Sequence, residues 1–158
     1  MTEDARFADG TERPLRLKAF DSDDLKVMAA LVQDAVFPAS EMQWDSRRRR
    51  FAVLLNRFRW EDKTRAETRG EFERVQSVLT VDDVHTIASQ GVPRGDADTV
   101  LSLLTLEFEP GPDGTGQLLL TLAGDGAIRL DVETLEVTLH DATRPYVAPS
   151  GKAPDHPE

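Results

Sequence analysis

Four consecutive arginines have the clearest capacity for binding in this chain: Arg47, Arg48, Arg49 and Arg50. They lie between Trp44 and Phe51, so cationic and aromatic side chains come together over a short stretch. Such a stretch can bind phosphates and stack bases, or meet an acidic protein surface. We therefore take Trp44 and residues 47–50 as a candidate interaction patch. The plainer interpretation is a solvated hairpin turn.

A second set of polar side chains lies on strands that are otherwise apolar: Arg57, Arg59, His85 and Asp131. A charge buried in the concavity of a sheet needs a reason, and a ligand or catalytic site would supply one. The alternative for Arg57 and Arg59 is pairing with nearby carboxylates such as Glu61 and Asp62. The exposure and pairing of these side chains distinguish a ligand pocket from simple ion pairs. Side chains that are exposed, or that only pair with carboxylates, argue against a pocket.

The histidines and glycines form no recognisable catalytic, metal-binding or phosphate-binding motif. His85 follows two aspartates and His140 precedes Asp141, but neither spacing matches a metal or acid–base motif. The glycine-rich stretches at 111–116 and 124–126 lack the pattern of a phosphate loop and fit hairpin turns. The sequence has no cysteine and no serine arrangement typical of a nucleophile. We therefore expect no bound metal and no cofactor, and these residues favour a non-catalytic protein over an enzyme without deciding between them.

The elements that position these residues begin with a short strand at 15–20, followed by a helix. Asp21 or Ser22 supplies the N-cap. Apolar residues then recur with helical spacing at Leu25, Met28, Val32 and Val36. We expect an amphipathic helix that ends by Val36, because Pro38 cannot continue it.

From Glu41 onward the pattern is that of β-strands. Met42 and Trp44 alternate, and after a polar break a long strand runs through 50–60 with apolar residues on both faces. Residues 72–81 and 84–91 predict a hairpin that turns at Asp82-Asp83. Three more strands follow, separated by the glycine-rich loops.

Residues 132–140 are open to two interpretations. Ile128, Leu130 and Val132 share one parity, whereas Leu135, Val137 and Leu139 share the other. This switch indicates a β-bulge or a turn near Glu133. A helix with Val132, Leu135 and Leu139 on one side is the alternative, although the β-branched residues favour a strand.

The charge of the chain is unevenly distributed. Its 158 residues, enough for one domain, carry a net charge of −10. Segment 47–74 has ten basic and five acidic residues, a local +5 that leaves −15 elsewhere. An acidic protein repels nucleic acid and anionic membrane, which argues against both as partners. The lack of cysteine, of an apolar N-terminal stretch and of long apolar segments favours a cytoplasmic location.

Five blocks of the sequence resemble a known family. They are LKAFDSDDLKVMAALVQDAVF, RRFAVLLNRFRWE, FERVQSVLTVDDV, VLSLLTLEFEP and AGDGAIRLDVETLEVTLHD. Together they are similar to an uncharacterised bacterial family, the domain-of-unknown-function family 2948, which is associated with alphaproteobacteria. The similarity covers about residues 15–142. The resemblance implies no activity, cofactor or catalytic residue, so it leaves the function open.

We expect one α+β domain over residues 15–142, with residues 1–14 and the proline-rich 143–158 as disordered tails. One amphipathic N-terminal helix should pack on a curved, mainly antiparallel sheet of about seven strands, which could close partly into a barrel. The function expected first is a non-catalytic protein-interaction module that binds another protein or a second copy of itself. A small-ligand binder or enzyme that uses the sheet concavity is the alternative. Weak nucleic-acid binding through 47–50 is third.

Overall fold

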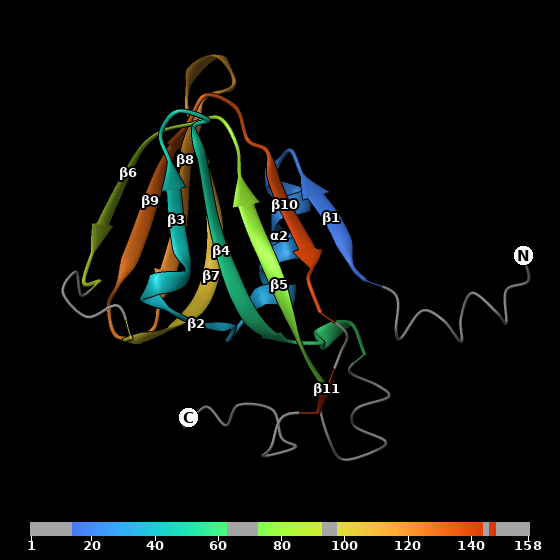
Figure 1. The fold of residues 1–158 in the computed structure, drawn as a ribbon. Helices are drawn as coiled ribbons and strands as arrows, with labels where there is room; N and C mark the ends of the chain where they lie inside the picture. The colour runs from blue at the N-terminus through green and yellow to red at the C-terminus, as the bar shows by residue number, and fades with distance from the viewer. Residues whose placement is uncertain (1–13, 63–72, 93–97, 144–145, 148–158) are drawn as a thin grey trace, which may run out of the picture.

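The computed structural model describes residues 14–62, 73–92, 98–143 and 146–147, which form one α-helix and one bent sheet (Figure 1). The helix is α2 (Ser22–Val32), and three short 3-10 turns are η1 (Ala39–Glu41), η2 (Trp60–Asp62) and η3 (Pro112–Gly114). The strands are β1 (Arg16–Ala19), β2 (Val36–Pro38), β3 (Met42–Asp45), β4 (Arg50–Phe58), β5 (Glu73–Val81), β6 (Val84–Gln90), β7 (Val100–Pro110), β8 (Gly116–Leu122), β9 (Ala127–Val132), β10 (Val137–Asp141) and β11 (Tyr146–Val147).

The strands follow the order β1-β10-β5-β4-β2-β7-β8-β9-β6, with β3 joined to β4 and β11 joined to β5. Every pairing among them is antiparallel. The predicted α+β class is therefore confirmed. The predicted number of about seven strands is wrong, because the described residues form eleven. The sheet does not close into a barrel, because no pairing joins its outer strands β1 and β6.

The sheet folds back so that two layers face each other (Figure 1). One layer contains β1, β10, β5, β4 and β3, the other contains β7, β8, β9 and β6, and β2 links β4 to β7. Alternate residues of each strand point inward, as in β4, where Phe51, Val53 and Leu55 are buried. They meet Leu118 and Leu130 of the other layer in one hydrophobic core.

This arrangement leaves two open sides, and α2 covers the one between β1 and β7. Leu25, Met28 and Val32 of α2 are buried in the core as the helical spacing predicts. The Asp21 carboxylate accepts a hydrogen bond from the Asp24 N–H at 2.8 Å and so caps the helix. No helix in the described ranges is long and apolar enough to cross a membrane.

The helix ends at Val32, earlier than the predicted limit at Val36. Asp34 adopts a φ of 65°, which turns the chain out of the helix. The Asp34 N–H donates to the Leu103 carbonyl and the Leu103 N–H donates to the Ala35 carbonyl, each at 2.8 Å. Val36 therefore begins β2 and does not belong to the apolar face of the helix. Pairing with β7 gives hydrogen-bond partners to backbone N–H and C=O groups that would otherwise be buried without one.

The predicted hairpin at Asp82-Asp83 is wrong, although strands lie on both sides of it. β5 pairs with β4, β10 and β11, whereas β6 pairs with β9 in the other layer. Asp83 has a φ of 58° and turns the chain from one layer to the other. A hydrophobic pattern identifies two strands but does not say whether they pair with each other.

A second crossing between the layers lies at residues 133–136. It joins β9 to β10, so the change of parity near Glu133 is a turn and residues 137–141 are a strand, as the β-branched residues indicated. The Glu133 N–H donates to the Asp83 carbonyl at 2.9 Å, and the Asp82 N–H donates to the Glu136 carbonyl at 3.0 Å. These hydrogen bonds hold the crossing at Asp82-Asp83 next to the crossing at residues 133–136.

The predicted hairpin loops are confirmed, and part of one predicted tail is ordered. Gly114 and Gly124 have φ values of 83° and 80° in the turns that join β7 to β8 and β8 to β9. Within segment 143–158, Tyr146–Val147 forms β11 on β5. Residues 1–13 and 148–158 of the predicted tails lie outside the described residues.

Replacing the capping residue tests how the helix is held over its side of the sheet. We expect Asp21→Ala to lower the free energy of unfolding by about 1 kcal/mol, because the Asp24 N–H loses its acceptor. Asp21→Asn should keep most of the stability, because asparagine caps equally well. Urea unfolding followed by circular dichroism measures both variants. Equal losses would contradict a capping role.

Candidate functional site

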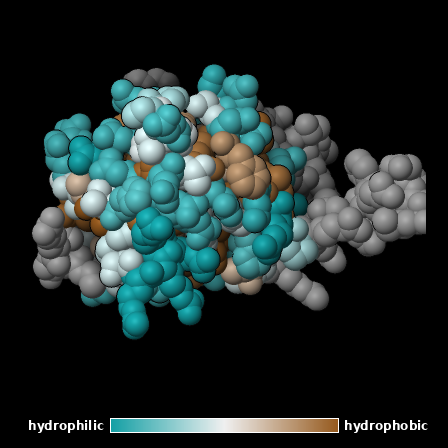
Figure 2. Space-filling view, turned by 90° about the horizontal axis from the view of Figure 1, so that it is seen from above, coloured by the Kyte–Doolittle hydropathy of each residue, from teal (hydrophilic) through white to brown (hydrophobic). Residues whose placement is uncertain are grey.

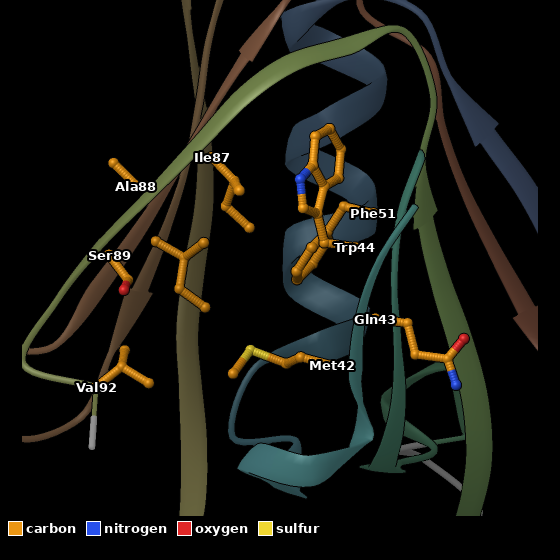
Figure 3. Close-up of a pocket in the computed structure, with 9 residues that line it drawn as sticks. Met42, Gln43, Trp44, Phe51, Ile87, Ala88, Ser89 and Val92 are labelled. Atoms are coloured by element: carbon orange, nitrogen blue, oxygen red, sulfur yellow. The ribbon is translucent and has the colours of Figure 1, made fainter. Parts of the chain in front are cut away.

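The side of the sheet that α2 does not cover contains an apolar hollow of about 220 Å³ (Figure 3). Its apolar lining consists of Met42, Trp44, Phe51, Ile87, Val92 and Ile128. Met42 and Trp44 come from β3, Phe51 from β4 and Ile87 from β6, and these side chains approach the hollow from both of its walls (Figure 3). We call the hollow, with the strands β3 and β6 beside it, the β3–β6 seam.

Strand register explains why these side chains point into the seam. Trp44 lies opposite Phe51, and Met42 lies opposite Val53. Residues directly opposite each other in an antiparallel pair share a face, so Trp44 and Met42 share the face of the buried Phe51 and Val53. By the same rule, Ile87 shares the inner face with Leu130, its buried partner on β9.

Both strands of the seam are edges in the part of the chain that the structure describes. β3 pairs only with β4, and β6 pairs only with β9. The first residue of β6 meets the turn that follows β3, where the Val84 N–H donates to the Arg49 carbonyl at 2.9 Å. From this closed end the two strands diverge (Figure 1). Edge strands present unpaired backbone N–H and C=O groups, so the seam offers hydrogen-bonding groups as well as apolar surface.

Arg49 and Arg50 fasten the closed end of the seam. One Arg49 nitrogen lies 3.6 Å from Glu133 and 3.3 Å from Nδ1 of His85. Arg50 Nε donates to Asp82 at 2.8 Å, and this hydrogen bond raises the pKa of Arg50 above its ordinary value. Both arginines therefore join the β3–β4 turn to the crossings between the layers.

Arg47 and Arg48 instead extend into solvent from the same turn. Their backbone N–H groups donate to one oxygen of Asp45 at 3.1 and 3.2 Å, which fixes the turn. The Arg48 side chain is 75% exposed and 3.8 Å from Asp45, and Arg47 forms no ion pair with any described residue. Hydrophilic residues cover most of this end of the molecule (Figure 2). The candidate patch thus contains two solvent-exposed arginines, one of them 3.8 Å from Asp45, beside a 37% exposed Trp44.

Arg57, from the predicted pocket, is fully buried and paired on every side. Its guanidinium donates two hydrogen bonds to Glu61, at 2.8 and 2.9 Å, one to Ser77 and one to Asp141. Burial lowers the pKa of Arg57, but the hydrogen bonds and charges of Glu61 and Asp141 outweigh it and raise the pKa above its ordinary value. The side chain stays a cation with its hydrogen-bonding capacity used inside the protein.

Asp141 connects this cluster to the first strand. Its carboxylate accepts hydrogen bonds from Ser77 at 2.7 Å and from the Leu15 N–H at 2.8 Å, besides the bond from Arg57. Its own N–H donates to the Leu15 carbonyl at 2.8 Å. The cluster therefore ties together β4, β5, β10 and the residue before β1. We name the group Arg57, Glu61, Ser77 and Asp141 the buried arginine cluster.

The other residues of the predicted pocket are paired or lie far from Arg57. Arg59 is 4% exposed, donates to Glu73 at 2.6 Å and lies 3.9 Å from Glu61. Both arginines thus pair with Glu61, as the alternative to a ligand pocket predicted. His85 contacts Arg49. Arg49 precedes Arg57 by eight positions, so the two arginines are separated by roughly 25 Å of extended chain along β4.

His85 and Asp131 do border a common open hollow, of about 430 Å³, beside the β7–β8 turn. Asp131 accepts a hydrogen bond from Thr86 and lies 3.6 Å from Arg129. The structure thus divides the four predicted pocket residues between two ends of the molecule. Among the described residues, no group of three or more His, Cys, Asp or Glu side chains could hold a metal ion.

The sequence interpretation named Trp44 and the arginines as candidates but did not name Ile87 or the hollow. Ile87 was assigned to a hairpin with β5, which would have placed β6 away from β3. Its strand carries a usable signal, because β6 has no proline and no acidic residue, lysine or arginine. Long uncharged edge strands are rare in soluble proteins unless something covers them.

Double-variant analysis tests the structural role of the buried arginine cluster. Arg57→Met or Asp141→Leu alone should lower the free energy of unfolding by about 3–5 kcal/mol, because the buried Asp141 then loses its cation, or the buried Arg57 loses one of its two carboxylate partners. The double variant should lose clearly less than the sum. The control Arg50→Ala removes an exposed ion pair and should cost about 1 kcal/mol or less. Additive losses in urea unfolding would contradict direct coupling.

Comparison with known proteins identifies a family. The family model described as "Protein of unknown function (DUF2948)" matches residues 15–156, a span that includes α2 and every described strand. This confirms the resemblance seen in the five sequence blocks. No curated protein and no solved structure matches the chain. The matched span contains the β3–β6 seam and the buried arginine cluster, and the chain belongs to the DUF2948 family of proteins of unknown function.

Proposed function

We propose that this protein is a non-catalytic module that binds another protein at the β3–β6 seam. The observation that carries the proposal is the half-exposed Trp44 over an apolar hollow, next to Arg47 and Arg48. Tryptophan and arginine are enriched among the residues that contribute most to protein interfaces. A partly buried tryptophan is also held in place by the protein, so little side-chain entropy is lost when a partner covers it.

The size of the hollow supports a protein partner over a cofactor. Pockets for small ligands and cofactors usually measure about 300–1,000 Å³. The hollow measures about 220 Å³. A cavity of about 150 Å³ holds benzene, so this hollow suits one large apolar side chain. The rest of the partner then lies on the strands and on the arginine turn around it.

Charge supports an acidic partner surface. Arg47 and Arg48 face solvent at the closed end of the seam. The chain as a whole carries a net charge of −10, so an acidic partner is repelled at a distance and attracted only at this turn. Binding should therefore weaken as salt screens the local attraction. A second copy of the chain is also acidic, and self-association is the alternative form of the same proposal.

The two other functions considered from the sequence have less support. For a ligand site in the concavity, Arg57 and Arg59 have their charges paired inside the protein. For nucleic acid, only two members of the four-arginine run, Arg47 and Arg48, are not engaged at the layer crossings, and the chain is strongly acidic. Neither function explains an apolar hollow beside unpaired strand edges.

Affinity purification from the source cells tests the proposal with matched variants. We expect proteins recovered with the wild type to drop by roughly tenfold with Trp44→Ala and with Arg47→Ala/Arg48→Ala, because these side chains form the contact. The controls Phe20→Ala and Arg16→Ala remove an exposed aromatic ring and an exposed cation elsewhere, and should recover the wild-type set. Quantitative mass spectrometry measures recovery, and circular dichroism verifies folding.

The outcome that contradicts the proposal is equal recovery by all four variants. Sedimentation velocity over a range of micromolar concentrations identifies self-association. A dimer that Trp44→Ala dissociates and Phe20→Ala preserves would mean that the partner is a second copy.

A further inference from the structure

We infer that the partner binds the seam as an extended segment that adds a strand to β6, at the edge where no described strand pairs with it. An apolar side chain of that segment fills the hollow, and acidic residues follow it beside Arg47 and Arg48. The inference rests on the proposed function and specifies the chemistry of the partner. Strand addition is a common way to recognise a peptide, because backbone hydrogen bonds give affinity and alternate side chains give specificity.

The edges of the sheet differ in how well they are protected. β1 is four residues long and exposes Arg16 and Lys18, and β3 is four residues long and ends in Asp45. β6 has seven residues, VHTIASQ, without lysine, arginine, acidic residues or proline. Its pairing with β9 is irregular only between Val84 and Thr86 and regular from Thr86 to Gln90. Soluble proteins normally block such an edge, so an open one suits strand addition.

Side-chain alternation connects this edge to the hollow. Residues of an added strand would share the alternation of β6, in which Ile87 and Ser89 lie opposite the buried Leu130 and Ile128. Every second side chain of the added strand therefore points toward the hollow between β6 and Trp44. The hollow accommodates one large side chain, and the intervening side chains face solvent.

Charge fixes which end of the segment is acidic. The seam is closed by the hydrogen bond from Val84 to Arg49, and the exposed side chains of Arg47 and Arg48 belong to that turn. The nearest carboxylate on the turn is that of Asp45, 3.8 Å from Arg48. A segment in the seam thus meets two cations at the closed end, where its own carboxylates are favoured.

The same geometry distinguishes an extended segment from a folded second copy. A segment with both edges free can lie between β6 and β3, whereas β6 and β3 of a second copy are each already paired on one edge, with β9 and β4. Asp82 and Glu133, acidic residues next to β6, are paired with Arg50 and Arg49. We therefore assign the seam to an extended acidic–apolar segment of a different protein.

A designed peptide with alternating valine and threonine around a central leucine, followed by two aspartates, is the probe. Trp44 reports binding in a Trp60→Phe background, because Trp44 and Trp60 are the two tryptophans of the chain. We expect a saturable blue shift of Trp44 emission as the leucine covers the ring. Affinity should fall as salt is raised, and replacing the aspartates with lysines should weaken it by roughly tenfold.

Two backbone-methylated versions of the peptide test strand pairing directly. One carries N-methyl groups on the odd-numbered amides, the other on the even-numbered amides. Only one set of amides faces β6 in an added strand, so only one version should lose affinity, by roughly tenfold. Equal binding by both versions and the parent peptide would overturn strand addition.

A lysine on β6 provides the matching protein variant. Ser89→Lys places a charge on the inner face of the exposed edge and should abolish peptide binding, whereas Leu119→Lys on the exposed face of β8 should leave it unchanged. If the peptide fails to bind at millimolar concentration while recovery of cellular partners still depends on Trp44, strand addition is wrong and the proposed function stands. If neither depends on the seam, both are wrong.

Discussion

A sheet that folds back on itself without closing into a barrel has two open sides. The organisation of this protein depends on what covers each of them. One side lies between β1 and β7, where α2 buries Leu25, Met28 and Val32 in the core. The other lies between β3 and β6, where Trp44 of the apolar lining remains 37% exposed. The helix and the proposed partner segment thus have equivalent positions, one supplied by the chain and the other from outside.

Charged side chains hold this open arrangement in place at both ends of β4. At one end Arg49 and Arg50 attach the β3–β4 turn to the two crossings between the layers. At the other end the buried arginine cluster joins β4 to β5 and β10, with burial and full pairing that suit a structural role. Arg47 and Arg48 belong to neither set of contacts, which is why their charge is available for binding.

Local patterns predicted most elements, and contacts between distant residues decided what they missed. The Asp21 cap, the alternation of β4 and the glycine turns are each encoded within a few residues. The end of α2 depends on Leu103, and the pairing of β6 depends on β9, so neither could be predicted from a short window. Trp44 and the arginines were chosen as candidates by residue type, whereas the hollow could not be inferred without knowing that β6 lies near β3. The change of parity near Glu133 was the available sign of a crossing.

The most direct test of the account is amide hydrogen exchange of the protein alone and in its complex purified from the source cells. Binding at the seam predicts slower exchange in β6 and β3, where edge amides gain a partner, and unchanged exchange in β1 and α2. Slower exchange confined to β1 or the exposed face of α2, with β6 unaffected, would contradict it and place the interaction on the opposite side of the sheet.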